Sequence, residues 1–94
     1  PQVRKYYEAA IKNLDDLLAR KPDDIWARVY RAHLNAEYTG DLADAMKTWR
    51  ECGKQCPENP APYFFLAEGY LRSGNLKECL GNISRAIALR ALGN

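Results

Sequence analysis

The chain has 94 residues, of which 47% are hydrophobic and 28% are charged, and its formal net charge is +2. This balance is that of one small globular domain and excludes a disordered tail. Charges of both signs alternate along the chain, so we expect no nucleic acid partner. The longest apolar runs cover only a few residues, far fewer than the roughly 20 that a membrane-spanning helix needs, and we therefore expect no membrane insertion.

The first predicted element is a helix over residues 2–20. Its apolar residues recur at steps of three and four, which places them on one stripe of a helix, whereas a strand would alternate in twos. Pro22 cannot continue a helix, and the two aspartates at residues 23–24 can begin the next one. The stripe of the first helix comprises Tyr7, Ala10, Leu14 and Leu17.

Two further helices are predicted over residues 24–38 and 42–55, separated by Gly40 and Asp41. Glycine tolerates the left-handed backbone that ends a helix, and aspartate can cap the helix that follows. Prolines between residues 57 and 60 break the chain after the third helix. The apolar stripes are Val29, Ala32, His33 and Ala36 in the second helix and Leu42, Ala45, Trp49 and Cys52 in the third.

The last two helices, predicted over residues 61–73 and 76–92, repeat the preceding pair with an offset of 34 residues. Gly74 and Asn75 take the places of the earlier Gly-Asp turn, and the first helix carries the same pattern displaced by 35 residues. The chain therefore contains two complete helical hairpins and the second helix of a third. The corresponding stripes are Tyr63, Leu66, Ala67 and Tyr70, followed by Leu76, Cys79, Ile83 and Ala86.

The repeat resembles the tetratricopeptide repeat (TPR), a 34-residue helical hairpin. Gly40 and Asp41 at the turn, the Ala45-x-x-x-Trp49 step and the closing Pro57 carry the resemblance. It implies an all-α fold, a right-handed superhelical stack of antiparallel helix hairpins with five helices and about two and a half repeats. It also implies one domain over residues 1–94, which we expect to be a piece of a larger protein. Within it, residues 1–22 are the second helix of a partial repeat, and residues 23–59 and 60–94 are complete repeats.

The resemblance further implies a non-catalytic scaffold or adaptor that binds a protein or peptide. In this family the first helices of the repeats line a concave groove, which the outward stripes of residues 24–38 and 61–73 would face. These stripes are aromatic with charged borders, as protein interfaces are, although single side chains could instead pack under a neighbouring helix. The predicted groove residues are Tyr30, Arg31, Leu34, Tyr38, Phe64, Phe65, Glu68 and Arg72.

Some members of the family hold acidic chaperone tails with Lys and Asn residues in this groove. The matching positions here are Tyr30, Leu34, Phe64 and Glu68, which lack those side chains. We therefore expect the partner to be a largely apolar or aromatic-bearing segment, extended or helical.

The alternative function is self-association. A stack of helical hairpins exposes an apolar face wherever it stops without a polar capping helix. The last predicted helix looks insufficiently covered by one neighbour, so we expect either further residues of a larger protein or a second copy of this chain to cover it. A homodimer through this face is the second hypothesis. The residues predicted for that contact are Leu80, Ile83, Ile87 and Leu89.

Three cysteines and one histidine offer four candidate zinc ligands, yet they lack the two close pairs of a zinc site. Cys52 and Cys79 fall on apolar stripes, which favours buried packing residues. We expect no metal, no cofactor and no enzymatic activity; an enzyme that uses His33 and a cysteine is the hypothesis left open. An odd number of cysteines without a disulfide pattern favours a cytoplasmic location.

Overall fold

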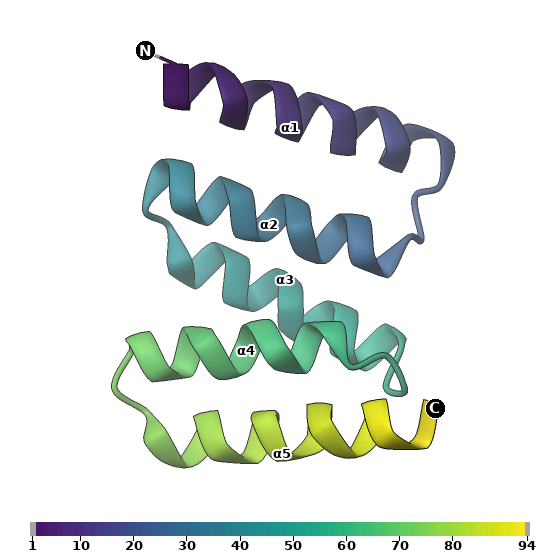
Figure 1. Ribbon diagram of the computed structural model, residues 1–94, viewed down its shortest axis with the longest axis vertical. Coiled ribbons are helices and arrows are strands. Elements are labelled where there is room, and N and C mark those ends of the chain that lie inside the picture. Colours follow the sequence, from purple (N-terminus) through teal and green to yellow (C-terminus); the bar gives the residue numbers. More distant parts are fainter. Residues whose placement is uncertain (1, 94) are drawn as a thin grey trace.

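The computed structural model describes residues 2–93 and shows five α-helices (Figure 1). They are α1 (Gln2–Arg20), α2 (Ile25–Thr39), α3 (Leu42–Gln55), α4 (Ala61–Arg72) and α5 (Leu76–Gly93). No strand occurs among these residues. The all-α prediction is confirmed, and each predicted helix end lies within about one residue of the observed end. Residues 1 and 94, which the predicted domain included, lie outside the described part of the chain.

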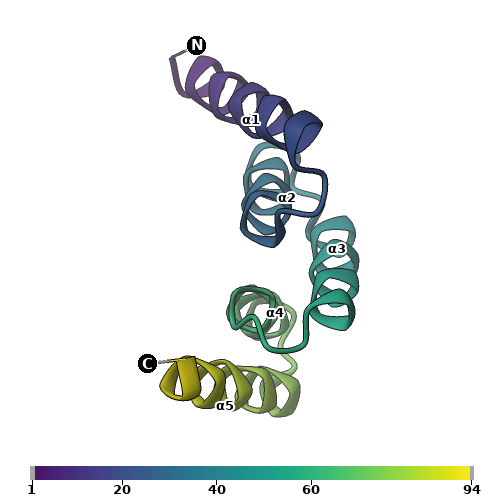
Figure 2. The same ribbon diagram turned by 90° about the vertical axis from the view of Figure 1, so that its right-hand side faces the viewer.

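Successive helices run in opposite directions, and each packs against the next along the chain (Figure 1). Seen from the side, the helices follow an arc in which α2 and α4 lie on one side and α3 on the other (Figure 2). Helix α2 also contacts α4 directly, although α3 lies between them in the sequence. We call the side of α2 and α4 that faces away from α3 the inner face. Two helices from different hairpins thus meet on one surface.

The two tight turns within the hairpins have the same geometry. Gly40 and Gly74 have φ angles of 80° and 79°, a left-handed conformation that costs a residue with a side chain about 1–2 kcal/mol. The following residue then caps the next helix. Side-chain oxygens of Asp41 and Asn75 accept hydrogen bonds from backbone N–H groups three residues later, at 3.1 Å and 3.2 Å. The sequence prediction for both turns is confirmed.

The longer breaks between hairpins are also closed by side-chain caps. Asp24 accepts a hydrogen bond from the backbone N–H of Ala27 at 3.0 Å and so caps α2. Before α4, Asn59 accepts one from the backbone N–H of Ala61 at 2.9 Å. Each cap satisfies a donor that the first turn of a helix leaves free, so both helices begin at defined residues.

The hydrophobic core lies where α2, α3 and α4 meet. Trp49 of α3 is 2% exposed, and its indole N–H donates a hydrogen bond to the backbone carbonyl of Val29 in α2 at 3.1 Å. Gly69 of α4 approaches α3 so closely that an added Cβ would lie 2.9 Å from the Cγ of Met46. The remaining buried members of this core are Ala36, Ala45, Cys52, Ala61 and Leu66.

The two helices at the ends of the arc contribute far less to this core. Helix α1 has no fully buried side chain, and α5 has one, Ala86. Each end helix packs against a single neighbour, whereas α3 packs against both α2 and α4. Most of the burial that stabilises the fold therefore comes from its middle three helices.

Candidate protein-binding surface

Four large side chains on α2 recur at intervals of four residues, and we call them the α2 ladder: Trp26, Tyr30, Leu34 and Tyr38. Because each step of four residues turns about 40° further round a helix, the ladder forms a strip that covers about 120° of the α2 surface from the start of the helix to its end. The three aromatic members are 48%, 44% and 40% exposed. Clusters of exposed aromatic rings are typical of protein–protein interfaces.

The contacts of the ladder place it on the inner face. Val29 is buried in the core on the α3 side of the helix, and Tyr30 lies about 100° further round. The Tyr30 ring packs edge-on against Phe65 of α4, with centroids 5.5 Å apart. At the other end, Tyr38 stacks on Tyr7 of α1 at 6.3 Å. The ladder therefore occupies the strip of α2 that lies between α1 and α4.

A hollow of about 250 Å³ adjoins the ladder between α1 and α2. Two of its lining residues, Val3 and Tyr6, are exposed, so the hollow opens to solvent on the α1 side. Its volume is below the roughly 300–1,000 Å³ of sites for small-molecule ligands. It therefore has room for one or two apolar side chains. The lining consists of Val3, Tyr6, Tyr7 and Ala10 of α1 and Leu34 of the ladder.

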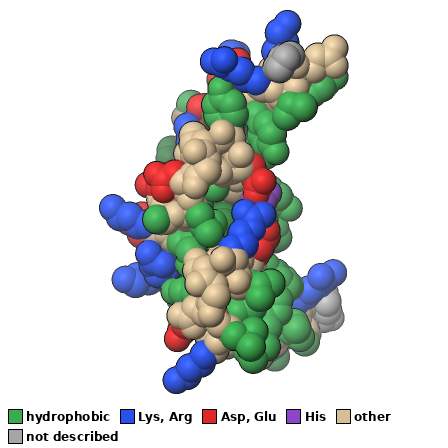
Figure 3. Space-filling model, turned by 90° about the vertical axis from the view of Figure 1, so that its left-hand side faces the viewer, with side chains coloured by type: hydrophobic (Ala, Val, Ile, Leu, Met, Phe, Trp, Pro, Cys, Tyr) green, Lys and Arg blue, Asp and Glu red, His purple; other side chains and the backbone are tan. Residues whose placement is uncertain are grey.

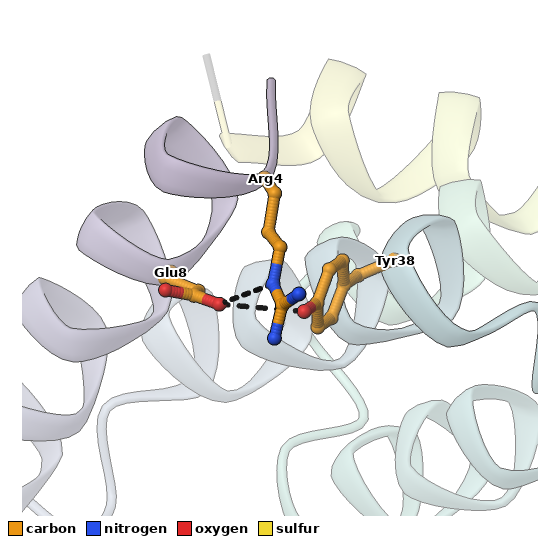
Figure 4. A network of polar contacts seen from close by, with 3 residues as sticks. All are labelled: Arg4, Glu8 and Tyr38. Carbon is orange, nitrogen blue, oxygen red and sulfur yellow. Dashed lines mark hydrogen bonds and ion pairs between the residues drawn. The ribbon is translucent and has the colours of Figure 1, made fainter. Parts of the chain in front are cut away.

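A polar cluster holds the end of the ladder against α1 (Figure 4). The Nε of Arg4 donates a hydrogen bond to Glu8 Oε1 at 2.8 Å, and the Tyr38 hydroxyl donates to the same oxygen at 3.4 Å. The hydrogen bond to Glu8 raises the pKa of the Arg4 guanidinium above its ordinary value. These side chains are exposed, so their polar contacts add little stability.

Charged residues at the border of the ladder are paired with one another. Arg31 of α2 forms an ion pair with Asp15 of α1. Arg72 of α4 pairs with Glu37 of α2 at 3.0 Å and with Glu68 at 2.9 Å. Both border arginines thus have carboxylate partners within the chain, which makes the surroundings of the ladder close to neutral.

The structure exposes four of the eight predicted groove residues and leaves the other four half-buried, and Phe65 is the one of these four that packs against the core. Its ring lies 5.1 Å from the His33 ring and 5.4 Å from the Trp49 ring, and it packs against the core. Helix α4 contacts both α2 and α3. These contacts cover part of the side of α4 that the sequence periodicity predicts to face the groove. The other predicted residues are half-buried (Arg31, Leu34, Phe64) or exposed (Tyr30, Tyr38, Glu68, Arg72).

Sequence periodicity did not predict three exposed residues of this surface: Trp26, Tyr6 and Val3. The Trp26 ring stacks on Tyr30 at 5.9 Å, which extends the predicted stripe by one turn. The four-residue spacing between the two was the signal that could have found it. Tyr6 and Val3 gave no such signal, because their exposure depends on how α1 lies over α2.

Helix α5 exposes a second apolar surface. Leu80 and Ile87, both predicted for self-association, are 56% and 58% exposed. Ile83 is half-buried, and so is Leu89, which lies one turn from the buried Ala86. Figure 3 shows hydrophobic side chains gathered over the lower part of the molecule, where α5 lies. Leu80 and Ile87 are thus free for a contact, whereas Leu89 is turned partly toward the fold.

The cysteine environments favour thiols over reactive thiolates. Burial raises the pKa of the Cys52 thiol, and a hydrogen bond to Glu58 raises that of Cys56. Because the thiolate is the nucleophile, both shifts reduce reactivity at neutral pH. Cys56 lines a separate hollow of about 500 Å³ at the ends of α2 and α3, which therefore offers a protonated thiol.

Three other features bear on the chemistry of residues 2–93. In that range no cluster of three or more His, Cys, Asp or Glu side chains has the arrangement of a metal site. The three cysteines are free thiols. None of the helices described is both long and apolar enough to span a lipid bilayer.

Comparison with known proteins assigns no family. No protein-family model matches the sequence, and no curated protein matches it significantly. The function is therefore inferred from the surfaces themselves.

Proposed function

We propose that this chain is a non-catalytic protein-binding module of the tetratricopeptide-repeat type, which holds a peptide or protein segment against its inner face. The α2 ladder is the observation that carries the proposal. Solvent-facing positions of a helix that only packs are normally polar, whereas this one presents three exposed aromatic rings in a row. As a scaffold or adaptor, the module would act in the cytoplasm, where its free cysteines stay reduced.

The repeated local geometry supports the repeat type. Gly40 and Gly74, 34 residues apart, have φ angles of 80° and 79° and are each followed by a capping residue. The helices on either side of these turns pack as antiparallel neighbours. A unit that recurs in sequence, turn geometry and packing is what a helical repeat protein is built from.

Covering the ladder would supply the driving force for binding. A buried aromatic side chain removes about 150–250 Å² from water, and the ladder rings are close to half open. At roughly 25 cal/mol per Å², each ring that a partner covers contributes about 2 kcal/mol. Part of this gain is offset by the loss of motion on association, so we expect affinities in the micromolar range, about 1–100 μM.

The border charges define the kind of segment that fits. An acidic or basic partner gains little, because Arg31 and Arg72 already have carboxylate partners. An apolar or aromatic-bearing segment gains from the rings and from the hollow beside Leu34. The segment proposed here is therefore weakly charged, with one or two side chains long enough to enter that hollow.

A peptide-display selection on the purified chain tests the proposal. Peptides that it selects should be rich in apolar and aromatic residues, and Tyr30→Ser should weaken their binding by at least about 30-fold, the size of an interface hot spot. Calorimetry measures the affinities. Arg50→Ser on the exposed side of α3 is the matched control and should leave binding unchanged.

Two results would overturn the proposal. One is a selection that yields no binder from a library that performs normally on another target. The other is a set of peptides whose affinity falls with Arg50→Ser and not with Tyr30→Ser, while circular dichroism shows both variants folded.

A further inference from the structure

We infer that the segment held by the α2 ladder is rich in proline and lies along the ladder as a polyproline II helix. The inference rests on the proposed function, because it names the partner of that same surface. A polyproline II helix is left-handed, rises about 3.1 Å per residue and forms no hydrogen bonds within itself. Three properties of the ladder point to such a partner: the support of its rings, the hydrogen-bond donors on those rings, and its length and charge.

Each aromatic ring of the ladder is supported by another ring. Trp26 stacks on Tyr30 at 5.9 Å, and Tyr30 packs edge-on against Phe65 at 5.5 Å. Tyr38 stacks on Tyr7 at 6.3 Å. Rings held in this way lose little motion when a partner covers them, and a polyproline II segment loses little because it is already ordered in solution. A rigid aromatic strip and a rigid ligand therefore bind at a low cost in conformational entropy.

Two rings of the ladder carry hydrogen-bond donors that have no acceptor within residues 2–93. These donors are the indole N–H of Trp26 and the hydroxyl of Tyr30, and we call them the ring donors. The aromatic side chains that do donate within this range are Tyr38, Trp49 and Tyr63, at 3.1 to 3.4 Å. A partner that covers the ring donors removes their water, so it must supply acceptors as well as apolar area.

The need for acceptors distinguishes between three conformations of the partner's backbone. An α-helix uses its carbonyl groups internally and offers none of them to the ring donors. A β-strand needs backbone groups opposite its own N–H groups, and the side-chain surface of a helix presents none. In a polyproline II helix the carbonyl groups are free to accept, and proline has no N–H that would be left without a partner. Of the three, a proline-rich segment in this conformation meets the requirement best.

The length and charge of the ladder fit the same partner. Trp26 and Tyr38 are twelve residues apart, which is about 18 Å along α2, and about six residues of polyproline II helix cover that distance. Arg31 and Arg72 at the border are already paired with carboxylates, so an uncharged segment meets no unpaired arginine there. The expected partner is therefore an uncharged segment of about six residues, with prolines at every third position on the side that faces α2.

Calorimetry with a synthetic peptide of nine prolines, acetylated and amidated at its ends, tests the inference. The chain should bind this peptide with a dissociation constant below about 1 mM. The control is a peptide of nine alternating glycine and serine residues, which has carbonyl groups but neither proline rings nor an ordered backbone. It should bind at least about 10-fold more weakly, since both the apolar contacts and the low entropic cost are lost.

The variant Tyr30→Phe tests the hydrogen bond to a carbonyl group of the peptide. Phenylalanine keeps the ring but lacks the hydroxyl, so binding of the nine-proline peptide should weaken by about 3- to 10-fold. Tyr63→Phe is the matched control, because the hydroxyl of Tyr63 donates to the backbone carbonyl of Gly53 in α3 and lies outside the ladder. It should leave the affinity unchanged. Circular dichroism should show that both variants are folded.

Two results would overturn the inference and leave the proposed function in place. The first is no binding of the nine-proline peptide at about 1 mM, while the display selection yields apolar peptides without proline whose binding Tyr30→Ser weakens. The second is binding of the nine-proline peptide with equal affinity by the unmodified chain and by Tyr30→Phe. A selection that yields no binder at all, together with no binding of the nine-proline peptide, would overturn both.

Discussion

Helices α3 and α5 occupy the same place in successive repeats, but only α3 is covered by a helix on each side. Trp49 of α3 is almost completely buried, while Ile83 at the corresponding position of α5 is half-buried. Met46 is buried, and its counterpart Leu80 is mostly exposed. The apolar stripe is thus a property of the repeat, and its burial depends on whether another helix lies against it.

The largest difference between the two helices should appear in stability. Trp49→Ala should lower the free energy of unfolding by about 3–5 kcal/mol, because it empties a core site and removes the hydrogen bond to Val29. Ile83→Ala should cost about 1 kcal/mol when measured at a concentration at which the chain is a monomer. Urea unfolding followed by circular dichroism gives both values. Equal losses of unfolding free energy would mean that Ile83 of α5 is buried to the same degree as Trp49 of α3, which would contradict the difference between the two helices.

Thiol protection should sharpen the same contrast. Cys52 in α3 is fully buried, whereas Cys79 in α5 is half-buried. Iodoacetamide should modify Cys52 at least about 100-fold more slowly than Cys79, because the buried thiol reacts only after the helices open. Mass spectrometry of peptides sampled over time measures both rates, with Cys79→Ser to verify the assignment. Similar rates for the two thiols would argue against a closed core around α3.

The turns that precede the two helices should behave alike, since their geometry is the same. Gly40→Ala and Gly74→Ala should each lower the free energy of unfolding by about 1–2 kcal/mol. An added Cβ meets no atom within 4 Å at either position, so the cost comes from the left-handed backbone alone. Gly81→Ala within α5 is the control and should stabilise the chain by up to about 1 kcal/mol. Urea unfolding separates these cases, and a gain in stability at either turn would contradict the shared geometry.

The smallest predicted effect concerns Cys56, which caps α3 where α5 has Arg90. The hydrogen bond to Glu58 raises the pKa of this thiol, so less thiolate is present at pH 8 than for an ordinary cysteine. Glu58→Gln removes the negative charge, lowers the pKa and should speed alkylation of Cys56 by a factor below about ten. The pH at which the alkylation rate reaches half of its maximum should fall by the same amount as the pKa of Cys56. A slower reaction in Glu58→Gln would contradict the assignment.

Local signals in the sequence were sufficient to predict the five helices. Steps of three and four residues set their extent, and Gly40 and Gly74 end helices whatever packs around them. Caps at Asp24, Asp41 and Asn75 are equally local, since each side chain bonds within three residues of itself. The ends of the helices could therefore be placed without knowledge of the tertiary structure.

The surface was harder to predict because it depends on how helices cross. Periodicity placed Phe65 on the outward side of α4, yet contact with α2 and α3 turns its ring toward Trp49. Trp26 stays exposed, and its ring stacks on that of Tyr30. Whether a side chain of an apolar stripe is exposed depends on which helices pack around it.

The location of the two tryptophans allows the most direct test of binding at the inner face. Trp26 is 48% exposed on the ladder, whereas Trp49 is 2% exposed in the core. Addition of a selected peptide should shift the tryptophan emission of the chain to shorter wavelength, as water is removed from Trp26. Trp26→Phe should abolish this shift while calorimetry still detects binding. A shift that persists in Trp26→Phe, or binding by the unmodified chain without any shift, would contradict a partner site on the α2 ladder.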